Sequence, residues 1–305
     1  MAKNLIQQLK DKITGGKKEK TSLYSADGVF HIVQGGKDYI LTDLPAGFVI
    51  KGNLDLSRKG LTELPDLSEI IVKGDFNCCK NQLISLRGAP QKVGGGFYCY
   101  NNQLTSLQGA PQEVGGSFDC CDNQLTTLQG APMEVGGDFD CDNNQLTTLQ
   151  GAPQEVGENF YCSYNELTSL EGAPQKVCRS FFCYNNQLTS LQGAPQEFGG
   201  NFDCRTNDGL SSLVGLPKMT EYQKIYCDEE FMEKYNCVKI IDHDTGSNYT
   251  LYKDLIASAK YQSEVSAYKI RQKKHENRAQ EDRAKQAQHK VGYAAFKKMK
   301  AEERE

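Results

Sequence analysis

The chain has 305 residues, of which 38% are hydrophobic and 24% are charged, and its formal net charge is −4. This apolar content is enough for a buried core, and no stretch approaches the roughly 18 consecutive apolar residues of a membrane-spanning helix. We therefore expect a soluble protein without a transmembrane span. Residues 1–20 carry a net charge of +4 and residues 249–305 a net charge of +6, so the middle of the chain is acidic, at −14.

The N-terminal part predicts two small segments before any repeat begins. Residues 3–14 fit a short amphipathic helix, and a charged linker completes the segment 1–20. The apolar side chains on one face of that helix are Leu5, Ile6, Leu9 and Ile13. Residues 21–50 predict a small β segment, in which Gly28 and the pair Gly35 and Gly36 mark turns. The continuous apolar region of a secretory signal is missing from this end.

A 21-residue repeat fills the middle of the chain. A phenylalanine recurs in seven copies, at Phe76, Phe97, Phe118, Phe139, Phe160, Phe181 and Phe202. A cysteine follows two residues later each time, at Cys78, Cys99, Cys120, Cys141, Cys162, Cys183 and Cys204. An asparagine, two leucines and a Gly-Ala-Pro keep the same spacing. A period of this length predicts a solenoid in which stacked coils bury what one unit cannot bury alone.

The spacing within a unit predicts which side chains lie inside. Phe and Cys at positions i and i+2 of a short strand point to the same face, which must be the interior. Leu54 begins an atypical first coil, and Leu210 and Leu213 continue the leucine columns one residue late. We therefore expect about eight coils over residues 51–220, with a parallel sheet about 40 Å long at about 4.8 Å per strand.

Residues 139–146 read Phe-Asp-Cys-Asp-Asn-Asn-Gln-Leu. This motif resembles the leucine-rich repeat, whose core is Leu-x-Leu-x-x-Asn-x-Leu, with Phe and Cys replacing the first two leucines. The resemblance implies an α/β solenoid with its parallel sheet on the concave face, and an asparagine that hydrogen-bonds the turns of adjacent coils. The Gly-Ala-Pro-Gln-(Glu/Lys)-Val-Gly-Gly segments are similar to those of leucine-rich repeat proteins from tailed bacteriophages and their bacterial hosts. This implies a phage-encoded protein in the host bacterial cytoplasm or in the virion.

The twelve cysteines predict buried thiols rather than disulfides or a metal centre. Seven of them form one column, an odd number, and parallel side chains on successive coils are badly oriented for bridging. No Cys-x-x-Cys spacing is present, and the four histidines are scattered, so we expect no metal site and no cofactor.

Three columns of side chains should project from the outer surface of the Phe-Cys strands, on the concave face. Their aromatic members flank an acidic centre. The aromatic residues are Tyr98, Tyr100, Tyr161, Phe182 and Tyr184, and the acidic residues are Asp119, Asp138, Asp140 and Asp142. We interpret these nine residues as a protein-binding strip, because exposed aromatic side chains are enriched at interface centres.

Two other interpretations of the strip stay open. Aromatic and polar residues pack well on any exposed sheet, so the pattern can be purely structural. Stacked carboxylates can also hold a cation. Nucleic acid is disfavoured on this face, because an acidic centre repels phosphate. Weak contact with nucleic acid remains open for the basic ends.

Residues 221–248 are expected to close the solenoid, and residues 249–305 to form a long, charged helical arm. The arm is polar in its middle and apolar again at its tip, which suggests docking to another structure. The predicted anchoring residues at the two ends of the chain are Leu5, Leu9, Tyr293, Phe296 and Met299.

The sequence favours a non-enzymatic interaction protein. It contains none of the phosphate-loop, zinc-protease or nucleophile-elbow motifs. The hypothesis is a scaffold that is fixed to a larger assembly by its terminal helices, as a virion accessory component, and that presents the concave face to a phage structural or host protein. The alternatives are a takeover factor that binds a host protein and a secreted leucine-rich repeat effector. A ubiquitin-ligase-like enzyme is the least favoured, because only about 85 residues follow the solenoid.

Overall fold

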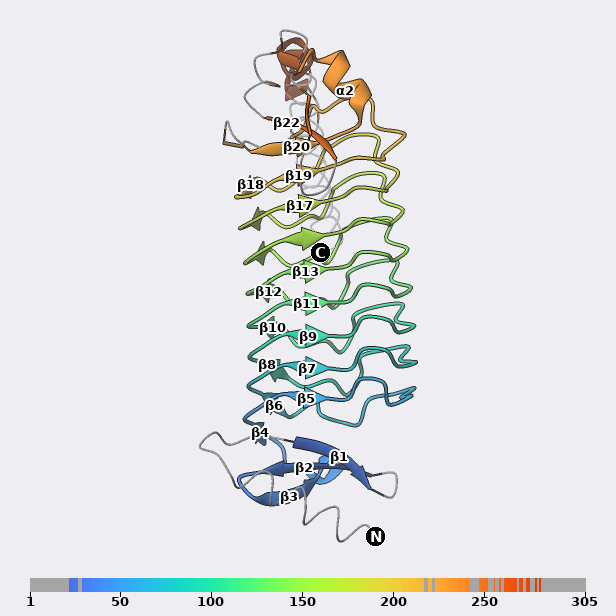
Figure 1. Ribbon diagram of the computed structural model, residues 1–305, viewed down its shortest axis with the longest axis vertical. Coiled ribbons are helices and arrows are strands. Elements are labelled where there is room, and N and C mark those ends of the chain that lie inside the picture. Colours follow the sequence, from blue (N-terminus) through green and yellow to red (C-terminus); the bar gives the residue numbers. More distant parts are fainter. Residues whose placement is uncertain are drawn as a thin grey trace, which may run out of the picture.

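The computed structural model describes residues 22–26, 29–216, 219–220, 223–237, 239–241, 247–251, 255, 258, 261–267, 269–270, 273–274, 278 and 280. The predicted N-terminal helix, most of the predicted arm and all five anchoring residues (Leu5, Leu9, Tyr293, Phe296 and Met299) lie outside them. The protein is a β-solenoid whose coils stack in a nearly straight column (Figure 1). The prediction of a repeat solenoid with about eight coils is confirmed.

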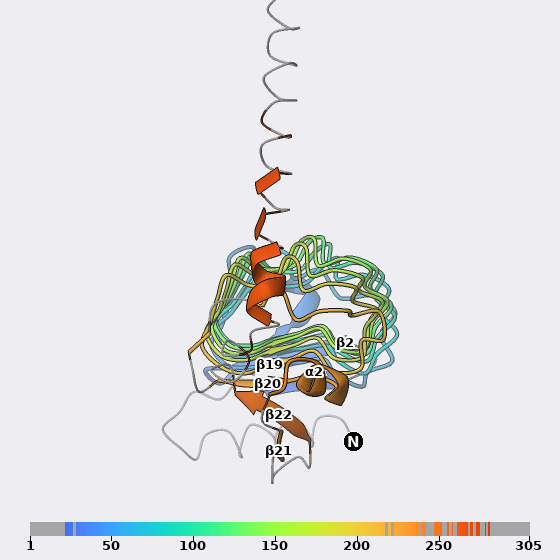
Figure 2. The ribbon, with the colours of Figure 1, turned by 90° about the horizontal axis from the view of Figure 1, so that it is seen from above.

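Each coil contributes one short strand to each of two parallel sheets. The first sheet, which we call the Phe sheet, contains β5 (Leu54–Asp55), β7 (Phe76–Asn77), β9 (Phe97–Tyr98), β11 (Phe118–Asp119), β13 (Phe139–Asp140), β15 (Phe160–Tyr161), β17 (Phe181–Phe182), β19 (Phe202–Asp203) and β20 (Lys224–Tyr226). Residues one repeat apart pair directly, as Phe118 does with Phe139. The sheet expected from the Phe-Cys motif is therefore confirmed, and the outlines of the coils superimpose along the axis (Figure 2).

The second sheet, the Val sheet, was not predicted. It contains β4 (Val49–Ile50), β6 (Ile71–Val72), β8 (Lys92–Val93), β10 (Glu113–Val114), β12 (Glu134–Val135), β14 (Glu155–Val156), β16 (Lys176–Val177) and β18 (Glu197–Phe198). Residues 49–210 are all described and contain no helix, so the α/β class is not confirmed. The physical reason is that six return segments carry Gly-Ala-Pro, which interrupts a helix. Five of these segments go on to a β-branched valine that pairs with the residue at the same position in the next coil.

The core is built from continuous columns of identical side chains. The phenylalanines of the seven repeats are 0% exposed. From Phe97 to Phe181, neighbouring rings stack with centroids 5.1–5.4 Å apart and interplanar angles of 6–9°. The cysteine column is equally buried, and all twelve cysteines are free thiols. Cys120 Sγ donates to the Asp140 carbonyl of the next coil at 3.2 Å, and burial raises the pKa of this thiol well above its usual range. The prediction of buried thiols is thus confirmed for the seven-member column, whereas Cys178 is exposed and Cys121 and Cys237 are partly exposed.

A ladder of buried asparagines ties each turn to the coil before it. Asn123 Nδ2 donates to the carbonyls of Cys99, Cys120 and Cys121 at 3.1–3.2 Å. Its Oδ1 accepts the backbone N–H of Leu104 at 3.0 Å. The same pattern recurs in the other repeats, as expected from the motif.

Both ends of the solenoid are covered by antiparallel strands. At the N-terminal end, β1 (Ser22–Ala26), β2 (Val29–Gln34) and β3 (Lys37–Ile40) form a sheet, and the 3-10 helix η1 (Leu41–Asp43) leads into β4. The β2–β3 hairpin turns at Gly35 and Gly36, whose φ angles are 59° and 73°, as a two-residue hairpin turn requires. At the C-terminal end, β22 (Asn248–Leu251) pairs with β20 and with β21 (Ile240–Ile241), beside helix α2 (Glu229–Lys234).

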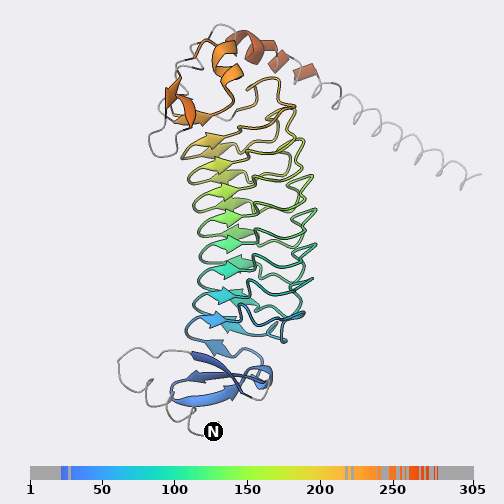
Figure 3. The same cartoon turned by 45° about the vertical axis from the view of Figure 1, so that its right-hand side comes forward.

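The start of the predicted arm is docked on the C-terminal end. Residues 261–267 are helical and lie across the last coil (Figure 3). Glu264 accepts hydrogen bonds from Ser212 Oγ at 2.7 Å and from Tyr235 Oη at 2.8 Å, and its other oxygen lies 3.1 Å from Lys234 Nζ. Tyr261 is 5% exposed against the Tyr235 ring. In the part of the chain that the structure describes, no helix has the length and apolar character needed to cross a membrane.

Candidate functional site

The outer face of the Phe sheet carries three columns of side chains, because the buried Phe and Cys alternate with residues that point outward. The first outer column, which precedes Phe, contains Asp75, Gly96, Ser117, Asp138, Asn159, Ser180 and Asn201. The second, between Phe and Cys, contains Asn77, Tyr98, Asp119, Asp140, Tyr161, Phe182, Asp203 and, in β20, Tyr226. The third, which follows Cys, contains Cys79, Tyr100, Cys121, Asp142, Ser163, Tyr184 and Arg205. All nine residues of the predicted strip therefore lie on this one face.

The first outer column is a second structural ladder. Asp138 Oδ1 accepts the backbone N–H of Asn159 at 2.8 Å and its side-chain Nδ2 at 2.9 Å. Asn159 Oδ1 in turn accepts the N–H of Ser180 at 3.0 Å. Asp138 thus holds two coils together, a role that the sequence did not predict for it.

The acidic centre is formed by Asp119, Asp140 and Asp142. Asp119 and Asp140 are directly paired on β11 and β13. Each uses Oδ1 to accept the N–H two residues on, from Cys121 at 3.1 Å and from Asp142 at 2.9 Å. Among the described residues, no lysine or arginine forms an ion pair with these three carboxylates.

Burial and mutual repulsion make these carboxylates hard to ionise. Burial raises the pKa of Asp140 to about 7, and the carboxylates of Asp119, Asp138 and Asp122 add to the effect. Burial, followed by the charge of Asp140, raises the pKa of Asp142 to about 7 as well. Burial also raises the pKa of Asp119 above its usual value. The centre would therefore gain from a positive charge placed beside it.

Aromatic rings lie on both sides of the acidic centre. Tyr161 and Phe182 stack at 4.8 Å with an interplanar angle of 6°. Tyr184 meets Tyr164 edge to face at 5.2 Å. On the other side, Lys80 Nζ lies 5.6 Å from the centre of the Tyr100 ring. A Cβ atom on Gly96 would come within 2.5–2.8 Å of the Tyr98 ring, so this glycine makes room for the tyrosine.

Tyr164 was missed by the sequence reasoning. It follows the third outer column and is 52% exposed, with a φ of 52°. Asparagine holds the equivalent left-handed position at Asn101, Asn143 and Asn185. A bulky residue in this conformation is strained, so a tyrosine here offers no backbone advantage.

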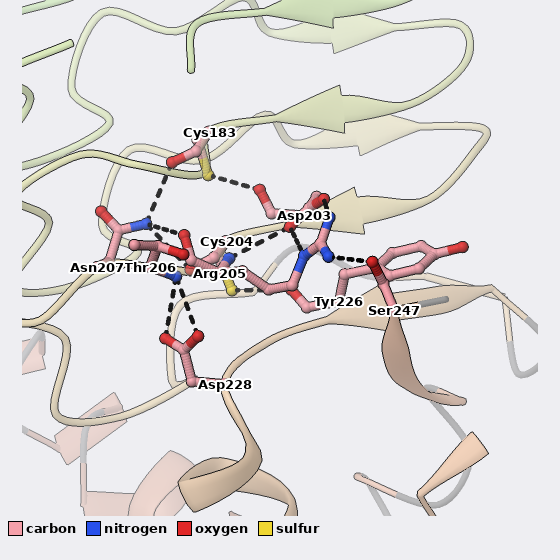
Figure 4. Close-up of polar contacts among 9 residues, drawn as sticks. All are labelled: Cys183, Asp203, Cys204, Arg205, Thr206, Asn207, Tyr226, Asp228 and Ser247. Carbon is pink, nitrogen blue, oxygen red and sulfur yellow. Dashed lines mark hydrogen bonds and ion pairs between the residues drawn. The ribbon is translucent and has the colours of Figure 1, made fainter. Parts of the chain in front are cut away.

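Arg205 was also missed as a functional neighbour, although it stands two residues after Asp203 and so on the same face. Figure 4 shows its guanidinium against Asp203: Nε lies 2.9 Å from Oδ1 and Nη2 lies 2.6 Å from Oδ2. The third nitrogen donates to Ser247 Oγ. The guanidinium lies 5.9 Å from the centre of the Tyr184 ring and 5.3 Å from that of Tyr226. The Asp203 carboxylate of the last repeat is thus neutralised by Arg205 of the same chain.

One group of possible metal ligands falls in the acidic centre. In the described part of the chain, Asp119, Cys121 and Asp140 place one ligand atom each within 4.8 Å of one another. Burial and the surrounding carboxylates raise the pKa of the Cys121 thiol far above its usual range. The set offers three ligands of mixed type, one thiol and two carboxylates, whereas structural zinc sites use four ligands that are mostly Cys and His.

No family model matches the chain, and no curated protein matches it. The functional assignment therefore rests on the geometry of the outer face.

Proposed function

We propose that this chain is a non-enzymatic interaction protein that captures a partner protein on the outer face of the Phe sheet. The observation that supports it is the arrangement of half-buried aromatic rings around carboxylates that form no ion pair with any lysine or arginine that the structure describes. Aromatic side chains on a rigid sheet lose little conformational entropy on binding and supply most of the affinity in many interfaces. The nine predicted strip residues are the proposed contact set, and Tyr164 joins them.

The wider setting belongs to the same proposal. The resemblance to leucine-rich repeat proteins of tailed bacteriophages favours a phage-encoded scaffold that works in the host cytoplasm or on the virion. Its terminal segments would fix it to a larger assembly. The docked helix 261–267 supports this, because the ion pair of Lys234 with Glu264 and the burial of Tyr261 would transmit force from an arm to the solenoid. A takeover factor that binds a host protein would use the same face.

The first test concerns the face. The triple change of Tyr98, Tyr161 and Phe182 to alanine should lower partner capture at least tenfold without unfolding the coils, because the rings are half-buried on the surface. The control replaces Ile84 and Met133 by alanine, which removes apolar side chains that are 64% and 63% exposed elsewhere. Capture that survives the triple change, or falls equally with the control, would contradict the proposed face.

The second test concerns the anchor. Removing residues 281–305 leaves β22 and the docked helix intact, whereas a cut at residue 248 would sever β22. Mass spectrometry compares the proteins that co-purify with the full chain and with this truncated chain. The truncated chain should lose the proteins of the larger assembly but keep the partner that binds the solenoid. Loss of both together would argue against separate anchoring and recognition parts.

A further inference from the structure

The last Phe-Cys repeat, which begins at Phe202, shows how this face accommodates a guanidinium. Arg205 forms a two-point ion pair with Asp203 in the second outer column, and its guanidinium lies 5.9 Å and 5.3 Å from the ring centres of two tyrosines. One ring, Tyr184, precedes Arg205 in the third outer column, and the other, Tyr226, follows Asp203 in the register of β19 and β20. Paired hydrogen bonds to a carboxylate together with aromatic contacts are the arrangement that guanidinium groups favour.

The acidic centre carries the same kinds of side chain without the arginine, on four successive coils rather than three. Tyr100 precedes Cys121 in the third outer column, as Tyr184 precedes Arg205. Tyr161 follows Asp140 in the register of β13 and β15, as Tyr226 follows Asp203. Between the two tyrosines stand Asp119 and Asp140, side by side. We call these four residues, Tyr100, Asp119, Asp140 and Tyr161, the slot.

Lys80 lies over the Tyr100 ring, but no described lysine or arginine forms an ion pair with Asp119 or Asp140. The third outer column explains why. The counterpart of Arg205 is Cys121 in the coil of Asp119 and Asp142 in the coil of Asp140, so charge is either absent or of the wrong sign. Beyond them, Ser163 is 0% exposed, and its N–H donates to Asp142. The Ser163 hydroxyl has no hydrogen-bond partner among the described residues. Ser163 therefore adds no positive charge to this part of the face.

The chemistry of the slot favours one kind of cation. A zinc ion prefers nitrogen and sulfur ligands, and the acidic centre offers only one, the Cys121 thiol. An ammonium group is a compact charge that makes no planar contact with Tyr100 or Tyr161. A guanidinium has five donors for two adjacent carboxylates and a flat face for one of the two rings. Its hydration is also weaker, which suits a half-buried site.

We propose that the slot binds an arginine side chain of the captured partner, presented on an extended basic segment. This inference rests on the proposed function, since it names the chemistry that the same face recognises. The internal Arg205 is its structural precedent, and the acidic middle of the chain would attract such a segment.

The first experiment supplies the missing arginine from within. Cys121→Arg places a guanidinium beside Asp119 at the position that Arg205 holds beside Asp203. We expect the melting temperature at pH 8 to rise above that of wild type, and partner capture to fall at least tenfold because the slot is filled. The control is Cys121→Gln, which introduces a long polar side chain without a charge. It should neither raise the melting temperature nor lower partner capture. A melting temperature that falls in Cys121→Arg but not in Cys121→Gln would overturn the proposal.

The second experiment uses a defined probe with the full chain. Fluorescence anisotropy compares a labelled peptide, Gly-Ser-Gly-Arg-Gly-Arg-Gly-Ser-Gly, with the same peptide carrying neutral citrulline in place of arginine. We expect at least tenfold weaker binding of the citrulline peptide, and an equal loss when the arginine peptide meets Asp119→Asn/Asp140→Asn. Glu134→Gln, on the exposed face of the Val sheet, should bind as wild type does. Equal binding of the two peptides, or full binding to the double variant, would overturn the proposal.

Failure of this inference can be told apart from failure of the proposed function. If capture of the partner needs Tyr161 and Phe182 but is unchanged in Asp119→Asn/Asp140→Asn, the face binds a protein but the slot does not recognise an arginine side chain. If capture is unchanged in both sets of variants, the proposed function itself is wrong.

Discussion

The buried asparagine ladder shows how strictly a single atom is specified in this fold. Asn123 Nδ2 faces three carbonyl oxygens, and only a donor can occupy that position. Its neighbour Gln124 is exposed and makes no such contact through its side chain. The pair therefore allows one chemical change, amide to carboxylate, to be compared inside and outside the core.

Asn123→Asp should lower the free energy of unfolding by about 3–5 kcal/mol, because an uncompensated charge would be buried against carbonyl dipoles. Gln124→Glu, the matched change at the surface, should stay within about 0.5 kcal/mol of wild type. Urea denaturation of both variants gives the comparison. Near-equal stabilities would show that the asparagine does not hold the turn.

The acidic centre makes stability depend on pH in an unusual direction. The pKa of Asp140 is about 7 in the folded protein, above the value of about 3.9 in an unfolded chain. The folded state therefore binds a proton more tightly, and the stability present at low pH is lost as the pH rises through about 7. A residue that stays neutral at this position avoids that loss.

Asp140→Asn should consequently gain about 2 kcal/mol relative to wild type between pH 5 and pH 8. The amide keeps the hydrogen bond to the N–H two residues on, as Asn77 does in its own coil. Asp203→Asn should instead lose stability at both pH values, because Arg205 would be left without its partner. Denaturation midpoints of both variants at pH 5 and pH 8 provide the test, and a pH-independent difference for Asp140→Asn would contradict the raised pKa.

Whole elements were predictable wherever one residue fills the same position in every coil. The Phe, Cys and Asn columns follow from the 21-residue period, because each is buried at a fixed place and its replacement would leave a cavity or an unpaired group. The Val sheet was not predicted, since each of its strands is only two residues long and gives little periodicity. Its signal was present in the repeated pair of a charged residue and a valine. In the pair Glu134 and Val135, for example, the first side chain is exposed and the second is buried, as in a half-buried strand.

At the same scale, the inward and outward phenylalanines of the Phe sheet should differ sharply. Phe139→Ala should cost about 3–5 kcal/mol of unfolding free energy, because the ring is 0% exposed and stacks on both neighbours. Phe182→Ala removes a half-buried ring from the outer face and should cost well under half as much. Similar losses for the two would contradict the assignment of the faces.

The candidate site was predictable only in part, for a physical reason. The columns place the nine strip residues on one face, and register alone brings Asp119 next to Asp140. Which polar groups already have partners depends on side-chain contacts that a period does not encode. Asp138 is engaged by Asn159, and Asp203 is neutralised by Arg205, whereas the centre is left with unbalanced charge.

The whole molecule is a long column of stacked coils, and we propose that recognition lies on one side of it and attachment at its ends. The two sheets give the column two long faces with different characters. The Phe sheet carries aromatic rings and unpaired carboxylates, and the Val sheet carries charged residues that in part pair along the column, as Lys92 does with Glu113 at 2.5 Å. A partner should therefore contact one face and leave the other free.

Site-specific photo-crosslinking tests this directly. A benzoylphenylalanine at Tyr164, which is 52% exposed beside the outer columns, should crosslink the partner in cells. The same group at Met133, which is 63% exposed beside the Val sheet, should not. Crosslinks from position 164 alone are the predicted result, and partner crosslinks from position 133 without any from position 164 would contradict the central claim that the Phe sheet is the recognition face.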